Sequence, residues 1–398
     1  MTRLGGKMPF AQAVEEMRHH QGVQIEESTL RGITHRYGKI AEAVAREEVA
    51  QIEAGGVASL AKPEKVLVSV DGAFVRLTSG EWHEVKTMIV GDIEAVREES
   101  TQEGQVITKD ISYFSRSCGI REFERLALAE LHRRGVFNAK SVVTVNDGAD
   151  WTQSFADYHF PQATRILDFR HATDYLTTAG QAALGEGTSS SKEWLERTTH
   201  QLKHEPPQQT LDDVRSLQTD SLSKADSEAV DQAYHYLKKR EAMINYPHFR
   251  ECGLPIGSGS VESSHKVVVH PRLKQAGMRW AQHHLDPMLA LRNLICNDRW
   301  DTGWSQIVAH YWQQRRQEFQ RIARCQRPYS PCLPTPVAEP SPVALPEPSP
   351  AALAQPSTTQ TPLLPSEPVP DKKQPYCPAP NHPWRRGIWP SRRTGHSQ

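Results

Sequence analysis

Three carboxylates in the sequence stand where they could act together on a phosphodiester. Asp71 follows the apolar run VLVSV, Asp147 follows VVTVN, and Glu262 follows the turn GSGSV. Side chains at the ends of neighbouring strands in an open α/β sheet project into one crevice, and a helix crossing that crevice can add another. Carboxylates brought together raise one another's pKa, and hard divalent cations relieve that repulsion. The pattern predicts a site for two Mg²⁺ or Mn²⁺ ions that supports phosphoryl transfer.

Each carboxylate also has a plain structural interpretation. Asp-Gly after a strand is typical of a turn, which applies to Asp71 and to Asp147 alike. Glu262 could simply favour the dipole of a helix that Ser258 or Ser260 caps. One residue alone therefore decides little, and it is the combination of the three that favours a metal site.

The segment after Glu262 is basic, as a helix beside DNA should be. No carboxylate occurs from 263 to 285. Its cations could position phosphates without reading sequence, and its tryptophan could stack on a base. A solvated helix face and a buried core position are the respective alternatives. The candidate DNA contacts are Lys266, Arg272, Lys274, Arg279 and Trp280.

Periodicity predicts the elements that must position these residues. Apolar and β-branched runs predict three sequential antiparallel strands, followed by a helix, a short buried strand, another helix and a last strand. The strands are expected over 65–77, 81–94, 105–115, within 141–151 and over 163–169, with the first helix over 121–135. This order predicts an α/β fold with a mixed sheet.

Helical and proline-rich segments surround that sheet. Residues 9–54 have helical spacing, with a turn and a Ser28/Thr29 cap before a short second helix; a helix-turn-helix that reads DNA and a plain helical hairpin both fit. Between Arg327 and Pro380 lie 17 of the 28 prolines, so this tail should be disordered. The expected domains are a helical N-terminal segment (1–60), the first part of a catalytic core (61–171), an all-helical insertion (172–250), the last helical part of the core with Glu262 (251–326) and a disordered Pro-rich tail (327–398).

Composition excludes some classes of protein. The 47 Lys and Arg balance the 47 Asp and Glu, so DNA binding must come from local patches. The six cysteines have neither CxxC nor zinc-ligand spacing, which suits a reducing cytosol. No signal peptide and no membrane-length apolar run is visible, so we expect a soluble protein of the cytoplasm that makes no membrane contact.

Four blocks resemble bacterial insertion-sequence transposases that carry a DDE triad. These are SVDGAFVRL, TVNDGADW, ILDFRHA and GSGSVESSHKVVVHPRLKQAGMRW, within about residues 60–305. The closest group is the Kra-type branch, related to Mutator-like elements, and NHPWRRGIW near the C-terminus also looks like that group. The resemblance implies an RNase H-like core with Asp71, Asp147 and Glu262 as ligands of two Mg²⁺ or Mn²⁺ ions. Asp150 is the alternative to Asp147 as the second metal ligand. We prefer Asp147 because Asp147 directly follows the apolar run and matches the family's Asp-Gly-Ala.

The family pattern assigns supporting roles and partners as well. An acidic residue or cysteine, two residues and then a histidine follow the second aspartate, here Asp168 and His171, which would position DNA or organise the edge of the site. A strand end and a helix cap are the structural alternatives for this pair. The implied partners are double-stranded DNA, both element ends and target, and further copies of the chain, with the protein on the nucleoid when bound.

Two departures keep other functions open. The chain begins about 70 residues before Asp71 and has no cysteine before Cys118, so we expect a shortened N-terminus without the cysteine-rich DNA-binding elements of many relatives. A catalytically decayed or truncated transposase that only binds DNA, and an RNase H-like nuclease without strand transfer, are the alternatives to an active transposase.

Overall fold

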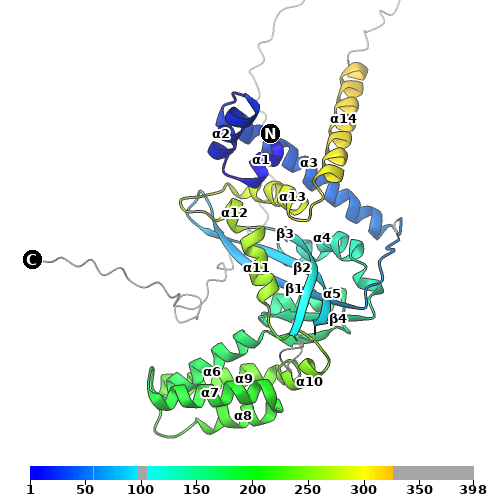
Figure 1. Ribbon diagram of the computed structural model, residues 1–398. Helices are drawn as coiled ribbons and strands as arrows, with labels where there is room; N and C mark the ends of the chain where they lie inside the picture. Colours follow the sequence, from blue (N-terminus) through cyan, green and yellow to red (C-terminus); the bar gives the residue numbers. More distant parts are fainter. Residues whose placement is uncertain (57, 97–104, 326–398) are drawn as a thin grey trace, which may run out of the picture. The chain divides into compact units, whose positions relative to one another are not determined.

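The computed structural model describes residues 1–56, 58–96 and 105–325, of which Met1–Arg321 form one compact unit. Within the described residues, five strands form a single mixed sheet in the order β3-β2-β1-β4-β5 (Figure 1). The strands are β1 (Lys65–Arg76), β2 (Trp82–Val96), β3 (Gln105–Arg116), β4 (Ser141–Asn146) and β5 (Thr164–Leu167). The expected α/β class and the positions of all five strands are confirmed.

Strand direction divides the sheet into two halves at β1. Strands β1, β2 and β3 run antiparallel to one another, whereas β4 is parallel to β1 and β5 is parallel to β4. A parallel connection needs a crossover, and helices supply it here: α4 (Ile120–Arg133) precedes β4 and α5 (Asp150–His159) precedes β5. The sheet is therefore mixed because its last two strands enter by helical crossovers.

Alternation along β1 assigns the two faces of the sheet. Val66, Val68 and Val70 share a buried cluster with residues of α4 and α5, including Phe123 and Phe155. The other face carries residues at odd positions of β1, which pack on two sets of helices. Leu67 belongs to the cluster of the helical insertion, and Ala73, Val75 and Leu77 to the cluster of the last helices. Asp71 has the same parity and faces that second layer.

The inserted helices begin slightly earlier than expected. They are α6 (Phe169–Leu184), α7 (Ser189–His204), α8 (Pro207–Ser216), α9 (Lys224–Lys239) and α10 (Tyr246–Glu251). Their own apolar residues, Leu176, Leu202 and Leu237 among them, are fully buried together with Val145 and Ile166 of the sheet. The insertion thus shares one core with the β4–β5 half.

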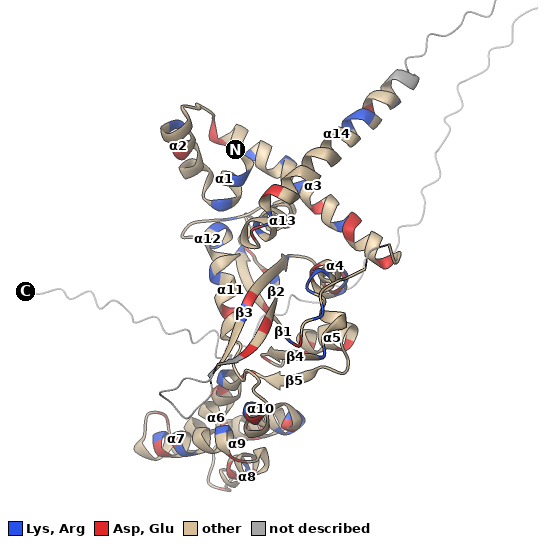
Figure 2. Ribbon diagram, turned by 45° about the vertical axis from the view of Figure 1, so that its right-hand side comes forward, with Lys and Arg blue, Asp and Glu red and all other residues tan. Residues whose placement is uncertain are grey.

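The N-terminal segment departs from the prediction. It consists of α1 (Thr2–Lys7), α2 (Phe10–Gln21) and α3 (Glu27–Glu53), along which acidic and basic residues are interspersed (Figure 2). A Ser28/Thr29 cap and a short second helix were expected, but Glu26 is the N-cap and α3 continues for 27 residues. Gly38 does not interrupt α3; a side chain there would come within 2.6 Å of the backbone of Pro287. DNA reading by α2 and α3 stays a prediction.

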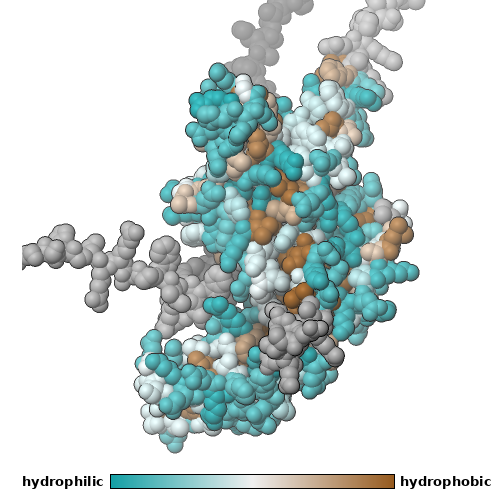
Figure 3. Space-filling view, in the orientation of Figure 1, coloured by the Kyte–Doolittle hydropathy of each residue, from teal (hydrophilic) through white to brown (hydrophobic). Residues whose placement is uncertain are grey.

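The last helices return to the sheet and to α3. They are α11 (Gly259–Val267), α12 (His270–Leu273), α13 (Leu285–Cys296) and α14 (Trp300–Cys325). Helix α11 packs against β1 and β2, and α13 lies between β3 and α3. No helix in the described residues is long and apolar enough to cross a membrane. On the face shown in Figure 3, hydrophobic residues are scattered among hydrophilic ones. The expected disordered tail, 327–398, lies outside the described residues.

The outer side of strand β3 is covered by side chains of α13. Asn297 accepts a hydrogen bond from the backbone N–H of Tyr113 and donates one to its carbonyl, both at 2.8 Å. Asn293 contacts both backbone groups of Ser115 in the same way, at 3.1 and 3.3 Å. Asp286 accepts from the N–H of Ser117 at 2.6 Å. Two side chains of α13 and its C-cap Asn297 therefore pair with outward backbone groups at the C-terminal end of β3 and just beyond it.

Candidate active site

Parallel pairing of β1 with β4 brings Asp71 and Asp147 level. The register is constant, from Lys65 opposite Ser141 to Val68 opposite Thr144, an offset of 76 residues. The same offset separates Asp71 from Asp147 (147 − 71 = 76). Beyond the last pair, the backbone N–H of Val70 donates to the side chain of Asn146 at 2.8 Å. This hydrogen bond keeps strands β1 and β4 together up to the residues that precede the two aspartates. We call Asp71, Asp147 and the groups that contact them the carboxylate site.

Asp71 lies within β1, which corrects the expectation of a strand end. The strand continues to Arg76, with Asp71 opposite Thr87 of β2, so Asp71-Gly72 forms no turn. Its carboxylate accepts the N–H of Gly72 at 2.7 Å through Oδ1 and contacts Nε2 of His265 at 3.1 Å through Oδ2. The neighbouring strand β4 ends at Asn146, level with Val70, whereas β1 continues. Asp71 thus occupies the position where β1 loses a neighbour and a crevice can open.

Asp147 directly follows β4, as expected for a residue at the C-terminal end of a parallel strand. Oδ1 accepts the N–H of Ala149 at 3.0 Å. Burial raises the pKa of Asp147, and the negative charges of Asp71 and Asp168 raise it further. The rival Asp150 is exposed in the first turn of α5. The charges of Asp71 and Asp168 are therefore near enough to act on Asp147.

The helical insertion holds the loop of Asp147 from the other side. The hydroxyl of Tyr236 on α9 donates to the backbone oxygen of Asp147 at 2.7 Å, and the guanidinium of Arg240 donates to that of Gly148 at 2.6 Å. Gly148 has φ +76°, and a Cβ there would come within 2.6 Å of the Tyr236 hydroxyl. Sequence reasoning missed both α9 residues, because nothing in a helical segment some 90 residues away indicates which loop it contacts.

Asp168 joins the carboxylate site to the start of α11. Its Oδ2 accepts the N–H of His171, which makes Asp168 the side-chain cap of α6, at 2.9 Å. Its Oδ1 accepts the N–H of Ser258 at 2.6 Å. Asp168 is 5% exposed. Asp168 directly follows β5, as the structural alternative expected, but the cap of α6 is Asp168 itself and not His171. A role of Asp168 in positioning DNA or organising the site's edge stays a prediction.

His171 lies beside the second aspartate. Its positive charge, when present, lowers the pKa of Asp147. Its ring has edge contacts with Tyr175 and Tyr236, at 5.4 and 5.9 Å between centroids. The backbone N–H of His171 is the one that Asp168 caps. The structure therefore places the pair on the Asp147 side of the site and leaves DNA contact by His171 a prediction.

Glu262 approaches from the helix that covers β1. It lies in the first turn of α11 and is exposed, and the side chain of Ser258 makes no cap. His265, three residues later, is the residue that contacts Asp71. Positions i and i+3 share one side of a helix, so Glu262 stands on the side of α11 that carries the Asp71 contact. His265 was not among the expected site residues, although this i,i+3 spacing in VESSH was a usable signal.

The donor chemistry of the carboxylate site fits a divalent cation. Oxygen ligands suit Mg²⁺ and Mn²⁺. Burial, and after it the negative charges of Asp71 and Asp168, raise the pKa of Asp147, and a bound cation would favour its ionised form. In the described part of the chain, no three His, Cys, Asp or Glu residues converge closely enough to hold a metal ion. The structure brings Asp71 level with Asp147, and it leaves Glu262 exposed on α11.

Burial corrects two of the five expected DNA contacts. Trp280 is 6% exposed and packs in the core beside β1, as the alternative for it held. Arg272 is 1% exposed, and its Nε donates to the backbone oxygen of Gly5 at 2.8 Å. Burial lowers the pKa of Arg272 to about 10. The remaining three are exposed and stay candidates: Lys266, Lys274 and Arg279.

Arg272 belongs to the packing of the N-terminal helices. Its guanidinium lies over the rings of Phe10 and Trp280, at 4.3 and 4.9 Å from their centroids. The basic stretch predicts a surface cation at this position, but the single turn of α12 buries Arg272 together with Leu273. The sequence of α12 is too short to reveal which side would be buried.

Comparison with known proteins adds no identity to this geometry. No protein-family model matches the sequence, and no curated protein matches it.

Proposed function

We propose that this protein is a DDE-type DNA transposase that cleaves and joins DNA strands at the ends of an insertion sequence. The observation that carries the proposal is the parallel register of β1 and β4, which brings Asp71 level with Asp147, while α11 carries Glu262 over the same strand. An RNase H-like core is part of the proposal, and the mixed five-stranded order supports it. We further propose that it acts on double-stranded DNA as a homo-oligomer, on the nucleoid.

Asp71, Asp147 and Glu262 would hold two Mg²⁺ or Mn²⁺ ions. Such ions activate a water or 3′-hydroxyl and stabilise the leaving oxygen. The chain's own task is to keep its carboxylates in place and ionised. The N–H of Gly72 and the ring of His265 orient Asp71, and the N–H of Ala149 orients Asp147.

Two residues bear on the position of Glu262, the third proposed ligand. Asp168 binds the N–H of Ser258, the N-cap of α11, and thereby fixes where the helix of Glu262 begins. The exposed Lys266 follows on the same helix and can contact a phosphate. DNA that binds along α11 would therefore meet Glu262 and its neighbouring cation together, which supports closure of the site on its substrate.

Two other functions compete with this proposal. An RNase H-like nuclease would share the carboxylates but leave strands unjoined; the long helical insertion before Glu262 favours the transposase. A decayed transposase would bind DNA without cutting it, and the presence of all three carboxylates with Asp71 and Asp147 brought level counts against it. Both alternatives predict products that one assay separates.

The experiment is cleavage and strand transfer on DNA that carries the element's own terminal repeats, with Mg²⁺ or Mn²⁺. Wild type is compared with Glu262→Gln, which keeps shape and removes charge. Glu193→Gln is the matched control, because Glu193 is also an exposed helical glutamate but lies on α7. We expect cut and joined products from wild type and the control, and none from Glu262→Gln.

Other outcomes identify the other functions. Cut but unjoined DNA would indicate a nuclease. DNA binding without products from any protein would indicate a decayed transposase. Equal cleavage by wild type and Glu262→Gln would show that Glu262 is not a ligand and that the triad is wrong.

A further inference from the structure

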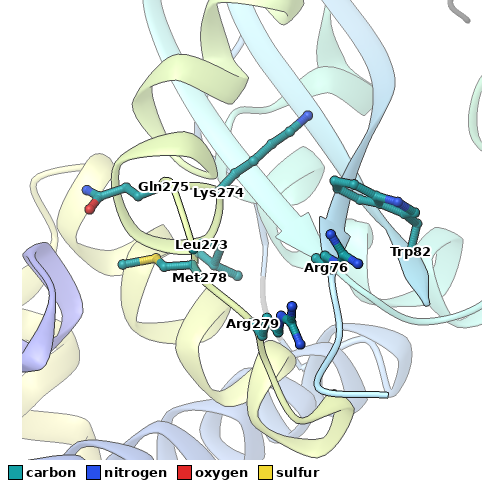
Figure 4. A pocket seen from close by; sticks show the side chains of 8 residues that line it. Arg76, Trp82, Leu273, Lys274, Gln275, Met278 and Arg279 are labelled. Atoms are coloured by element: carbon teal, nitrogen blue, oxygen red, sulfur yellow. The ribbon is translucent and has the colours of Figure 1, made fainter. Parts of the chain in front are cut away.

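A pocket of about 230 Å³ lies beside the tip of the β1–β2 hairpin (Figure 4). One wall is the hairpin, with Arg76 and Trp82 opposite each other in the β1–β2 register. The other wall is the loop that follows α12, residues 274–280. Trp280 secures this loop to the free side of β1: its N–H donates to Arg76 at 3.0 Å, and its carbonyl accepts from Thr78 at 2.9 Å. We call this cavity the Trp82 pocket.

Three cations surround the Trp82 pocket. Arg76, Lys274 and Arg279 are all exposed. Among the residues that the structure describes, none of the three has a carboxylate within ion-pair distance. In Figure 4 their charged ends lie on the side of the loop that faces Trp82, and Gln275 and Met278 point away. Three uncompensated positive charges around one cavity favour an anionic ligand.

The pocket also offers an aromatic surface. Trp82 is 58% exposed, among the highest values for a large hydrophobic residue in the described chain. The guanidinium of Arg76 lies 6.0 Å from the centre of its ring, and the buried Leu273 closes the pocket from below. Apart from this contact with Arg76, much of the Trp82 ring is open to solvent. An aromatic ring beside cations is the combination that binds a base by stacking and its phosphate by charge.

We propose that the Trp82 pocket binds one unpaired nucleotide of the DNA strand, with the base stacked on Trp82 and its flanking phosphates held by Arg76, Lys274 and Arg279. The assignment to DNA rests on the proposed function. The cavity lies below the lower limit of about 300 Å³ for pockets that bind whole drug-sized ligands, which suits a single nucleotide. A paired base could not stack on the ring, so the nucleotide must be at a strand end, in a single strand or turned out of the duplex.

The position of the pocket along β1 sets a spacing on the DNA. Arg76 is five residues beyond Asp71 on the same strand, which corresponds to about 17 Å at about 3.4 Å per residue. Stacked DNA rises about 3.4 Å per nucleotide, so for a strand that runs along β1 the bound nucleotide would lie about five positions from the phosphate at the carboxylate site. The proposal thus specifies both the kind of nucleotide and where it lies.

The first test measures binding without catalysis. The full chain is titrated in EDTA with a fluorescent single-stranded oligodeoxynucleotide and with the same sequence as duplex. Trp82→Ala should weaken single-strand binding about 5- to 150-fold, the range that base–aromatic stacking gives, and Trp82→Phe should restore most of it. Trp312→Ala is the control, because Trp312 is 56% exposed but lies on α14. Equal affinity of Trp82→Ala and wild type would overturn the proposal.

Two further experiments test the phosphate contacts of the cations and whether the bound nucleotide belongs to a DNA strand or is free. Lys274→Gln and Arg279→Gln should each reduce the slope of log affinity against log salt by about one, as expected when one phosphate contact is lost. Free deoxynucleoside monophosphate is added as competitor. Competition at the affinity of the oligonucleotide would assign the pocket to free nucleotides and overturn the DNA strand as its occupant.

The last test combines position with cleavage. Single abasic sites are placed one at a time along substrate DNA, and the loss of affinity is measured for wild type and for Trp82→Ala. Wild type should show one sensitive position about five nucleotides from the cleaved bond, and Trp82→Ala none. Cleavage that is indifferent to abasic sites and to Trp82 would refute the pocket alone. Binding that depends on Trp82 in a chain that cleaves nothing would refute the proposed function alone.

Discussion

The carboxylate site and the Trp82 pocket both lie on β1, and they are built in opposite ways. At the carboxylate site, the insertion, β4 and α11 contact the aspartates: two hydrogen bonds from α9 hold the loop of Asp147, and His265 of α11 contacts Asp71. At the pocket, exposed side chains surround an open cavity, and only the backbone of the 274–280 loop is fixed. Groups that handle the reacting phosphate need fixed positions, whereas groups that hold a strand need access and charge.

This contrast predicts different responses to mutation. Changes at the carboxylate site should affect folding and cleavage together, because the same contacts serve both. Changes in the Trp82 pocket should affect DNA affinity and leave the free energy of unfolding almost unchanged.

The largest effect should come from Asp147→Asn, which should lower the rate of cleavage while raising the stability of the metal-free fold. Cleavage should fall about 100-fold or more, since a metal ligand contributes several kcal/mol to the transition state. The metal-free variant should nevertheless melt higher than wild type at pH 7.5. Burial and neighbouring charges raise the pKa of Asp147, so ionising it costs stability, and asparagine keeps the acceptor for Ala149.

The sign of this effect depends on pH. With a raised pKa in the folded state, wild type loses stability as pH rises from about 4, the ordinary value for aspartate, through the folded pKa. Melting curves in EDTA between pH 4.5 and 8 should therefore diverge with rising pH. Mg²⁺ should raise the melting temperature of wild type and not that of Asp147→Asn. A variant that melts lower than wild type across this range would contradict the electrostatic account.

The next effect compares two glycines with the same backbone conformation. Gly148 at the carboxylate site and Gly277 at the pocket both have φ +76°, but only Gly148 is crowded. Alanine in the left-handed region costs about 1–2 kcal/mol at either position. Gly148→Ala should lose about 1–3 kcal/mol more by overpacking against Tyr236 and Arg240, measured by urea unfolding. Equal losses would mean that the insertion does not hold this loop.

A third comparison separates two cations of the basic stretch. Arg272→Gln should lose about 2–3 kcal/mol of stability, because a buried charged hydrogen bond to Gly5 and the packing on Phe10 disappear. Lys274→Gln should stay within about 0.5 kcal/mol of wild type and bind DNA more weakly. Chemical unfolding and DNA titration of both variants measure this. Normal stability of Arg272→Gln with weakened DNA binding would restore Arg272 as a DNA contact.

The smallest effect concerns the hydroxyl of Tyr236. Tyr236→Phe removes its hydrogen bond to the backbone of Asp147, worth about 1 kcal/mol, and should slow cleavage a few-fold without changing DNA affinity. Tyr234→Phe on the same helix is the control, since the described residues offer its hydroxyl no hydrogen bond. A slower Tyr234→Phe would point to a general defect of α9.

Local pattern predicted the strands and helices of the core but not how distant segments meet. The apolar run before Asp71 and the periodicity of α4 depend on neighbouring residues, and both were confirmed. The single helix α3 was missed because its continuation past Gly38 depends on α13, more than 240 residues later. The burial of Arg272 and the contact of Tyr236 with Asp147 were also missed, because they too depend on residues far away in the sequence. Tertiary packing decided each of these, and no local signal reports it.

The amide side chains of α13 have a consequence for how the molecule behaves in a crowded cell. Strand β3 is the last strand of its sheet, and a bare outer strand is a template on which another chain can add and start aggregation. Asn293 and Asn297 occupy the backbone groups that a foreign strand would need. These two asparagines thus hinder the addition of a foreign strand at this end of β3, and replacing both with leucine should increase aggregation, measured by light scattering.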